Sequence, residues 1–469
     1  MDSMAMRPAL LLPEIVLFLG ALAALLGGSF LPRTRQWVTR VVAAAALLLP
    51  AVLAAVALTG PTAVAMEGSF TVDPTTGVAR LVATLGALVV LALATDEIAG
   101  SPRESETYAL LLLSTTGTLV LAGADDLLVV AVGFLLTSVP LYGLIGITGT
   151  AVAAEAAMKT YLLGALFGIL LLAGVTLLYG VSGTTSYAGL ADPLAAAPQA
   201  VVAAGVVGVL GGLLFKAGGV PAHFWVPDAA QAAGGAVAAF LTTVPKIGAV
   251  MAAYRLVGAL PDTLAWPLLV GVLAVASMTV GNLAAYAQTD PRRLLGWSTV
   301  SQVGYLLVPV AVAGRSDLAL PSLLLYLAGY TATNLAAFAV TTAFPRRREL
   351  SAYRGVGRRY PWLAAALVVA LLGLVGTPPT AVFVGKLTTT AAAWDAGDAW
   401  LAVLVLLNTL GSLFYYLRWI APLYARPTTE HPEDGDPPAP WSRWTAVATA
   451  GLSVLLGLGA GALWAVFSA

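Results

Sequence analysis

The 469-residue chain contains no cysteine, which excludes thiolate-ligated iron–sulfur clusters, zinc–thiolate sites and disulfides within it. Only 10% of its residues are charged, against about 25% in an average soluble chain. Basic and acidic residues are equal in number, so nothing in the charge indicates nucleic-acid binding. Two histidines, His223 and His431, form no strong metal-ligand cluster, and no Gly-rich phosphate loop stands out.

The chain is instead rich in apolar residues, which make up 59% of it, and its mean hydropathy is +0.90. Since a membrane-spanning helix needs roughly 20 apolar residues, we predict an all-α polytopic membrane protein with about fourteen spans. The first apolar stretch, Leu10–Gly28, lacks a convincing small-residue cleavage site, so we interpret it as a span rather than a signal peptide. The predicted spans are residues 9–29, 38–58, 76–96, 107–123, 127–148, 156–180, 198–219, 232–256, 265–287, 294–314, 318–343, 361–391, 399–424 and 443–467.

The arginines fall mostly in loops that join an odd-numbered span to the next even-numbered one, as at Arg33, Arg103 and Arg347. The positive-inside rule predicts that these loops are cytoplasmic and that both termini lie outside. One such loop, residues 427–440, is acidic and rich in proline. We predict that it is a flexible cytoplasmic connector and that His431 is a solvated loop residue.

The chain has only four lysines, and all of them lie in long apolar stretches: Lys159, Lys216, Lys246 and Lys386. An ionisable residue within a membrane span is a functional-site hypothesis by default. Lysine can gain and lose a proton when buried, whereas arginine stays charged. The pattern therefore predicts a proton path.

Two predicted spans contain both a lysine and helix-breaking residues. Lys216 lies within Gly211–Pro221, and Lys386 follows Gly376–Pro379. Corresponding breaks in the two halves of a transporter indicate an ion site, although ordinary proline kinks with lysines reaching the interface are the alternative. The breaks are five spans apart, which predicts two five-helix repeats, the second inverted. The predicted parts are an N-terminal three-helix segment (1–106), a first repeat (107–256), an inverted second repeat (257–424), and a cytoplasmic loop with a C-terminal helix (425–469).

The other two lysines have different settings. Lys246 lies near the middle of its span, which indicates water or a counter-charge nearby. Lys159 lies nearer the cytoplasmic end of its span, four residues after Glu155, so the two side chains share one helix face. They form either part of the path or an ion pair at the membrane interface. His223 is either a proton relay or a hydrogen-bonding anchor of the broken helix.

The remaining charged residues have simpler interpretations. Asp125 and Asp126 precede a span, where carboxylates favour the helix dipole. Asp228 is predicted to serve a turn or a helix cap, and the pair Arg292-Arg293 to anchor the start of a cytoplasmic helix.

Several motifs succeed one another along the chain. They are Leu11-Leu12-Pro13-Glu14, Glu155 to Ala165, Phe215 to Asp228, Arg293 to Leu307, and Gly376 to Lys386. In this order and at these separations the chain resembles the antiporter-like membrane subunits of respiratory complex I. The ending Pro227-Asp228 is most similar to the subunit N family of bacterial NADH-quinone oxidoreductase.

This resemblance implies that Lys216 is the central lysine of a first half-channel, that Lys246 connects the halves and that Lys386 belongs to the second half-channel. Lys159 matches a further lysine of the family. The resemblance also implies a proton-translocating subunit of a complex in the bacterial plasma (inner) membrane. Its expected partners are other antiporter-like subunits, small membrane subunits and the lipid bilayer. No cofactor is expected in this chain, because NADH and quinone are used elsewhere in the assembled complex.

The chain departs from the family pattern at Leu135, where a glutamate is usual. In the family this glutamate pairs with the lysine of span seven, so Lys216 lacks its expected partner unless Glu155 replaces it. Gln302 stands at a usually polar position and can form hydrogen bonds but does not titrate. Two other functions therefore stay open: a subunit of a multisubunit cation/proton antiporter, and a structural subunit that does not conduct.

Overall fold

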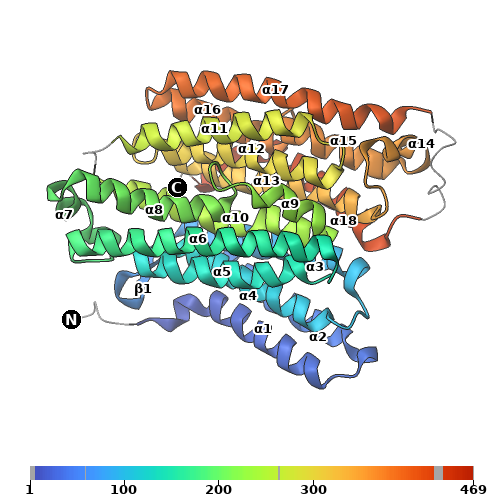
Figure 1. Ribbon diagram of the computed structural model, residues 1–469, viewed down its shortest axis with the longest axis horizontal. Coiled ribbons are helices and arrows are strands. Elements are labelled where there is room, and N and C mark those ends of the chain that lie inside the picture. Colours follow the sequence, from blue (N-terminus) through green and yellow to red (C-terminus); the bar gives the residue numbers. More distant parts are fainter. Residues whose placement is uncertain (1–5, 59, 262–264, 427–436, 468–469) are drawn as a thin grey trace. The chain divides into compact units, whose positions relative to one another are not determined.

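The computed structural model describes residues 6–58, 60–261, 265–426 and 437–467. These residues are almost all helical (Figure 1), which confirms the predicted all-α membrane class. The strands among them, β1 (Ala63–Ala65) and β2 (Phe70–Val72), pair in antiparallel register with Ala65 opposite Phe70. The predicted connector at 427–440, with His431, lies largely outside the described residues.

The α-helices are α1 Leu12–Phe30, α2 Trp37–Ala57, α3 Pro74–Ile98, α4 Glu104–Gly123, α5 Leu127–Gly146, α6 Ala151–Ser182, α7 Ala191–Ala196, α8 Gln199–Ala217, α9 Trp225–Ala232, α10 Gly235–Gly258, α11 Trp266–Tyr286, α12 Pro291–Ala311, α13 Ala319–Ala343, α14 Val356–Arg359, α15 Pro361–Val375, α16 Ala381–Asp395, α17 Ala399–Tyr424, α18 Pro440–Leu458 and α19 Ala460–Phe467. Short 3₁₀ helices lie at Pro8–Leu11 (η1), Arg33–Arg35 (η2), Met66–Gly68 (η3), Tyr187–Gly189 (η4) and Leu350–Tyr353 (η5).

Within the described part of the chain, 11 helices are long and apolar enough to cross a membrane, or up to 12 if the pair α18 and α19, bent by 70°, is one span. This establishes a multi-pass membrane protein. Two of the fourteen predicted spans fall outside that count. One corresponds to α4, and the other is divided into α15 and α16, which have 15 residues each.

The chain divides into two compact units, whose boundaries differ from those of the predicted repeats. Unit 1 comprises Met1–Leu88, Gly100–Trp225 and Val244–Leu273. Unit 2 comprises Val89–Ala99, Val226–Thr243 and Ala274–Ala469. The repeats describe a symmetry of helix order, so they stay a prediction beside this division.

Unit 1 holds α8, and with it Lys216, by close packing against α6 (Figure 1). A Cβ atom added at Gly174 of α6 would lie 2.4 Å from the Gly205 carbonyl oxygen of α8. One added at Gly208 would lie 2.5 Å from the Leu170 carbonyl oxygen. Glycine is therefore required at these crossings, as is usual where membrane helices approach closely.

Two ion pairs inside unit 1 tie its elements together. The Arg80 Nε and Nη2 atoms of α3 each donate to a carboxylate oxygen of Glu14 on α1 at 2.8 Å, and both side chains are buried. Arg255 of α10 donates from Nη2 to both carboxylate oxygens of Asp73, also at 2.8 Å. Breaking a buried pair leaves an uncompensated charge, so the Glu14–Arg80 contact fixes α1 against α3.

Helix termini in unit 2 are capped by carboxylates. The Glu97 oxygens accept from the backbone nitrogens of Gly235 and Ala236 at 2.7 and 3.0 Å. Asp290 caps α12 by accepting from the nitrogens of Arg292 and Arg293 at 2.9 Å each. These bonds satisfy donors that have no partner within the helix.

Candidate functional site

Lys216 lies in the last turn of α8, in unit 1. The helix ends at Ala217 because Gly218 adopts a left-handed conformation with φ of 83°. The nitrogens of Gly218 and Gly219 both donate to the Leu214 carbonyl oxygen, at 2.7 and 2.9 Å. This terminates the helix within the stretch where the sequence predicts a break.

The Lys216 side chain is fully buried, and among the described residues its Nζ atom has no hydrogen-bond partner. Its nearest aromatic neighbours are Phe134 of α5, with a ring centroid 5.4 Å from Nζ, and Phe215, at 5.9 Å. Cation–π attraction of about 2 kcal/mol is the main favourable contact such an ammonium has here.

Lys246 lies on α10 in unit 1 and is also fully buried. Its Nζ atom donates to the carbonyl oxygen of Ala217, the last residue of α8, at 2.5 Å. The Trp225 ring lies 5.7 Å from Nζ, and its Nε1 atom donates to the Phe215 carbonyl oxygen at 3.0 Å. The ammonium therefore meets the C-terminal end of a helix, where the helix dipole favours a positive charge.

Lys386 lies on α16 in unit 2, after the second break. Here α15 ends at Val375 because Gly376 has a φ of 95°. Lys386 Nζ donates to the carbonyl oxygens of Leu374 and Val375 at 3.1 and 2.9 Å. It also lies 3.8 Å from the centroid of the Tyr305 ring.

Lys246 and Lys386 thus share one arrangement in separate units. Each buried ammonium donates to carbonyl groups that a helix leaves without partners where it stops at a left-handed glycine. Irregular backbone at membrane depth needs such partners. The break and the lysine stabilise one another in both places.

A network of neutral polar groups extends from Lys386 within unit 2. Gln302 Nε2 donates at 2.8 Å to the Leu374 carbonyl oxygen, the same atom that accepts from Lys386. The Tyr326 hydroxyl donates to Gln302 Oε1. Farther along α12, the hydroxyls of Ser298 and Tyr416 lie 2.5 Å apart. Gln302 is recognisable in the sequence as a polar residue within an apolar span, whereas the tyrosines are not, since aromatic residues on apolar helices give no signal of their own.

Two buried hydroxyls lie one turn away from members of this network. Ser322 precedes Tyr326 by one turn of α13, and Thr389 follows Lys386 by one turn of α16. Both are fully buried, and neither has a hydrogen-bond partner among the described residues. Buried polar groups of this kind are positions at which ordered water binds.

Lys159 and Glu155 are placed differently from what a buried proton path requires. Their side chains form an ion pair at 2.7 Å on α6, and they are 50% and 65% exposed. Glu155 is therefore not the replacement partner for Lys216, because it points to the exposed face of α6 and pairs there with Lys159. The expectation of an interfacial pair fits this geometry.

Leu135 is 46% exposed, whereas the adjacent Phe134 is buried. The α5 side chain that lies near Lys216 is Phe134. Position 135, where the family glutamate is usual, therefore lies on a more exposed part of α5 than its neighbour, since successive residues of a helix point in different directions. His223 is buried in the connection between α8 and α9, beside Phe224.

The predicted roles of the other charged residues can also be compared with the structure. Asp126 caps α5, accepting from the nitrogens of Leu128 and Val129 at 2.7 and 3.3 Å, as expected. Asp228 lies in the first turn of α9 and also pairs with Arg293 at 2.6 Å. Arg292 is buried and donates to the Ala233 carbonyl oxygen at 2.8 Å. No group of three or more potential metal ligands occurs among the residues searched, which are those described.

Comparison with known proteins gives consistent matches over nearly the whole chain. Residues 124–411 match the family model described as NADH:quinone oxidoreductase/Mrp antiporter, TM. NADH-quinone oxidoreductase subunit N of Mycobacterium sp. (strain JLS) is 63% identical over 460 residues, which are 98% of each chain.

Two solved structures have the same fold. A chain of respiratory complex I from Thermus thermophilus is 30% identical, with a TM-score of 0.83 over 97% of this chain and 100% of that one. A chain of the Mrp complex from a Dietzia species has the same TM-score, covers 98% of this chain and 96% of its own, and is 24% identical. The second likeness concerns the fold alone.

Proposed function

Because the chain belongs to the family of NADH-quinone oxidoreductase subunit N, an antiporter-like, proton-translocating membrane subunit of complex I, we propose that its protons move through Lys216, Lys246 and Lys386. The observation that carries this proposal is the burial of these three side chains, which are at most 4% exposed. A lysine at the centre of a membrane helix costs roughly 2.5–3.5 kcal/mol on insertion scales. Three such costs in one chain indicate a use for the amines.

The surroundings of the amines support proton transfer within each unit. Lys246 and Lys386 have carbonyl acceptors for an ammonium, whereas Lys216 has none among the described residues. The three amines therefore differ in how well they hold a proton. A change in the charge or hydrogen bonding around them can shift the proton from one amine to another. In unit 2 the proton continues through hydroxyls and water along Gln302, Tyr326, Ser322 and Thr389.

The arrangement that accompanies this function is also part of the proposal. We include fourteen spans, two inverted five-helix repeats, a cytoplasmic arginine-rich end and termini on the outside. This arrangement accounts for the charges of the loops and for the two broken helices. The subunit resides in a bacterial plasma membrane beside the other membrane subunits of a complex I-like assembly. NADH and quinone react in other subunits, and their redox chemistry drives the proton through this one.

Two alternatives are distinguished by specific features. The fold of the Mrp chain favours a cation/proton antiporter subunit, and Leu135 favours a subunit that does not conduct. The identity to subunit N over nearly the whole length disfavours the first. The three buried lysines disfavour the second, because a structural subunit has no need of them.

The test uses the assembled complex in proteoliposomes. Lys216→Met and Lys386→Met are expected to lower the number of protons translocated per NADH oxidised. Lys159→Met is the matched control, because it removes the same group from an exposed helix face. Unchanged pumping in both buried variants would sink the conduction proposal, and pumping lost equally in the control would mean that burial is irrelevant.

A further inference from the structure

Two cavities share Arg347 at the arginine-rich end of unit 2. The first has a volume of about 220 Å³ and the second about 280 Å³. The first is lined by Ala343, Phe344, Pro345, Arg346, Arg347, Pro437 and Ala439. The second is lined by Arg347, Arg354, Gly355, Val356, Arg358, Arg359 and Tyr360. Among the described residues that line them there are five arginines and no carboxylate.

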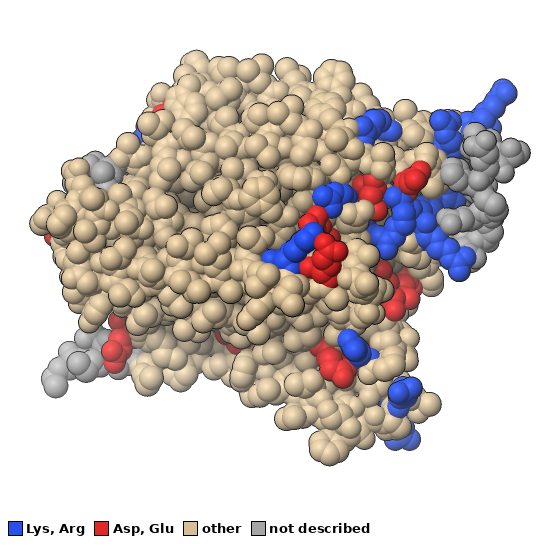
Figure 2. Space-filling model, in the orientation of Figure 1, with Lys and Arg blue, Asp and Glu red and all other residues tan. Residues whose placement is uncertain are grey.

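The sequence around these cavities carries a strong positive charge. Residues 345–360 contain six arginines and one acidic residue, Glu349. Basic side chains gather at the right-hand end of Figure 2, where α14 lies in Figure 1. The arginines are denser in and around these two cavities than they would be if scattered among the loops. Their combined positive charge attracts anions.

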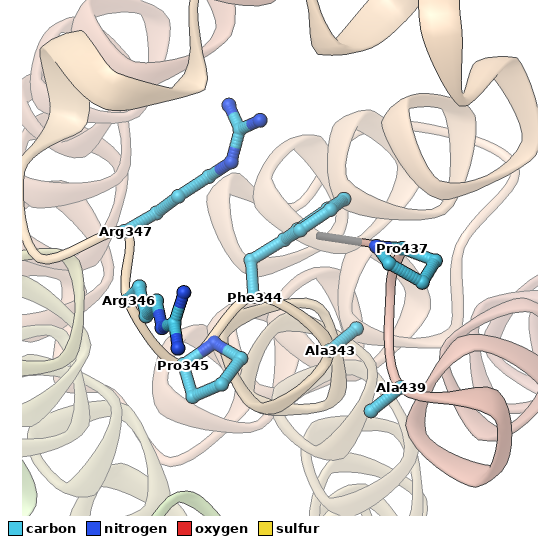
Figure 3. A pocket seen from close by; sticks show the side chains of 7 residues that line it. All are labelled: Ala343, Phe344, Pro345, Arg346, Arg347, Pro437 and Ala439. Atoms are coloured by element: carbon cyan, nitrogen blue, oxygen red, sulfur yellow. The ribbon is translucent and has the colours of Figure 1, made fainter. Parts of the chain in front are cut away.

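Arg347 is held in place between the two cavities. Its guanidinium lies 4.9 Å from the centroid of the Phe344 ring, and its Nη1 atom donates to the Ala352 carbonyl oxygen. Figure 3 shows Arg346 and Arg347 on one side of the first cavity and Pro437 and Ala439 on the other, with Phe344 between them. The cavity therefore has one cationic wall and one apolar wall.

Two further arginines of the second cavity have side chains that make no bond to the described part of the chain. Arg354 and Arg358 are exposed, and neither guanidinium donates a hydrogen bond to a described residue or forms an ion pair with one. A guanidinium matches phosphate geometry with paired donors. Arginines that point into a cavity without supporting the fold are suited to binding an external phosphate.

The cavities lie where four helices end. The nitrogen of Ala439, before α18, donates to the carbonyl oxygen of Ala343, the last residue of α13, at 3.2 Å. The nitrogen of Gly355, before α14, donates to the carbonyl oxygen of Pro422, near the end of α17, at 3.3 Å. Exposed aromatic residues stand at the ends of α17 and α18, namely Tyr424, Trp441 and Trp444, and Trp362 stands at the start of α15, which follows α14. Exposed tryptophan and tyrosine mark the level of the lipid headgroups.

We propose that these two cavities form a binding site for the phosphodiester headgroup of an anionic phospholipid. Arg347, Arg354 and Arg358 bind the phosphate, and the apolar wall formed by Pro437 and Ala439, together with Phe344, faces the first acyl carbons. Basic pockets between membrane helices are a recognised means of binding such headgroups. The site is separate from the buried lysines and does not depend on the proposed proton path.

The test is photo-crosslinking in the assembled complex, reconstituted in phosphatidylcholine with a small fraction of a diazirine-labelled phosphatidylglycerol. Crosslinked peptides are expected from residues 343–360 and 437–444. The variant Arg354→Gln/Arg358→Gln should reduce this labelling by roughly 25-fold, at about fivefold for each arginine. The control Arg348→Gln/Arg426→Gln removes two charges from the same end outside the cavities and should leave labelling unchanged.

The outcomes separate the possible occupants. Competition by unlabelled phosphatidylglycerol but not by inorganic phosphate supports the lipid site. Equal competition by inorganic phosphate overturns it in favour of a free-anion site. An equal loss of labelling in the control double variant also overturns it, because the attraction would then come from the charge of the whole surface. Blue native electrophoresis verifies that each variant assembles, and wild-type complex without these crosslinks refutes the proposal directly.

Discussion

Replacing Lys246 by methionine removes the amine that lies closest to a freed helix carbonyl and preserves most of the side-chain volume. The bond lost is the one from Nζ to the Ala217 carbonyl oxygen at 2.5 Å. Leaving that carbonyl without a partner costs about 1–3 kcal/mol. This loss is offset because the variant no longer buries a lysine, which costs roughly 2.5–3.5 kcal/mol at the centre of a membrane helix. The variant should therefore fold and assemble.

The effect on proton movement should be much larger than the effect on stability. Without a titratable group, a proton that crosses this position must be carried as an unsupported charge. The same cost of roughly 2.5–3.5 kcal/mol then becomes a barrier and slows transfer by about 70- to 400-fold. The rate is measured with a pH-sensitive dye inside proteoliposomes after NADH and a short-chain quinone are added.

Lys246→Arg separates proton transfer from a purely electrostatic role. Arginine keeps the positive charge and can donate to Ala217, but it does not release its proton. If the charge alone mattered, this variant would pump normally. We expect it to be as slow as Lys246→Met. A Lys246→Met complex that pumps within about twofold of wild type would refute the reasoning, because the barrier estimated from insertion costs would be absent.

Three further predictions concern the framework. Gly218→Ala should strain the backbone at the left-handed break, where φ is 83°, by about 1–2 kcal/mol. It should slow pumping by displacing the Ala217 carbonyl. The control Gly411→Ala, on α17, adds a methyl group in open space and should not slow pumping. Glu14→Gln should destabilise the complex by about 3–5 kcal/mol, because Arg80 would stay buried beside a neutral amide; an unchanged melting temperature would contradict this. Leu135→Glu should leave pumping unchanged, since the side chain is exposed; faster pumping, abolished again by Lys216→Met, would show that the acid does reach Lys216.

Much of the fold could be predicted from the sequence because lipid imposes simple rules on it. Apolar length locates helices, and arginines mark loop ends. The breaks near Lys216 and Lys386 could also be predicted, since glycine and proline terminate helices for local reasons. The count of fourteen spans goes beyond the 11 or 12 helices that are long and apolar enough, because one predicted span is divided into α15 and α16, each too short on its own, and α4 is not among the helices counted.

The parts that could not be predicted depend on the direction of side chains. The sequence does not show which of two adjacent residues, Phe134 or Leu135, faces Lys216, because α5 is apolar on all sides. Likewise, the sequence places Glu155 one turn before Lys159 but does not show whether the pair is buried, and in the structure it is half-exposed. The tyrosines around Gln302 were missed because their hydroxyls meet only when α12, α13 and α17 pack together.

The measurement that most directly tests the central claim is the number of protons translocated per NADH oxidised by the assembled complex carrying Lys216→Met, Lys246→Met and Lys386→Met together. It is compared with that of the Lys159→Met complex at matched rates of electron transfer. We predict that the triple variant loses the share of pumping that passes through this subunit, while Lys159→Met keeps the wild-type ratio. A wild-type ratio in the triple variant would contradict the account, because protons would then cross the complex without any buried amine of this chain.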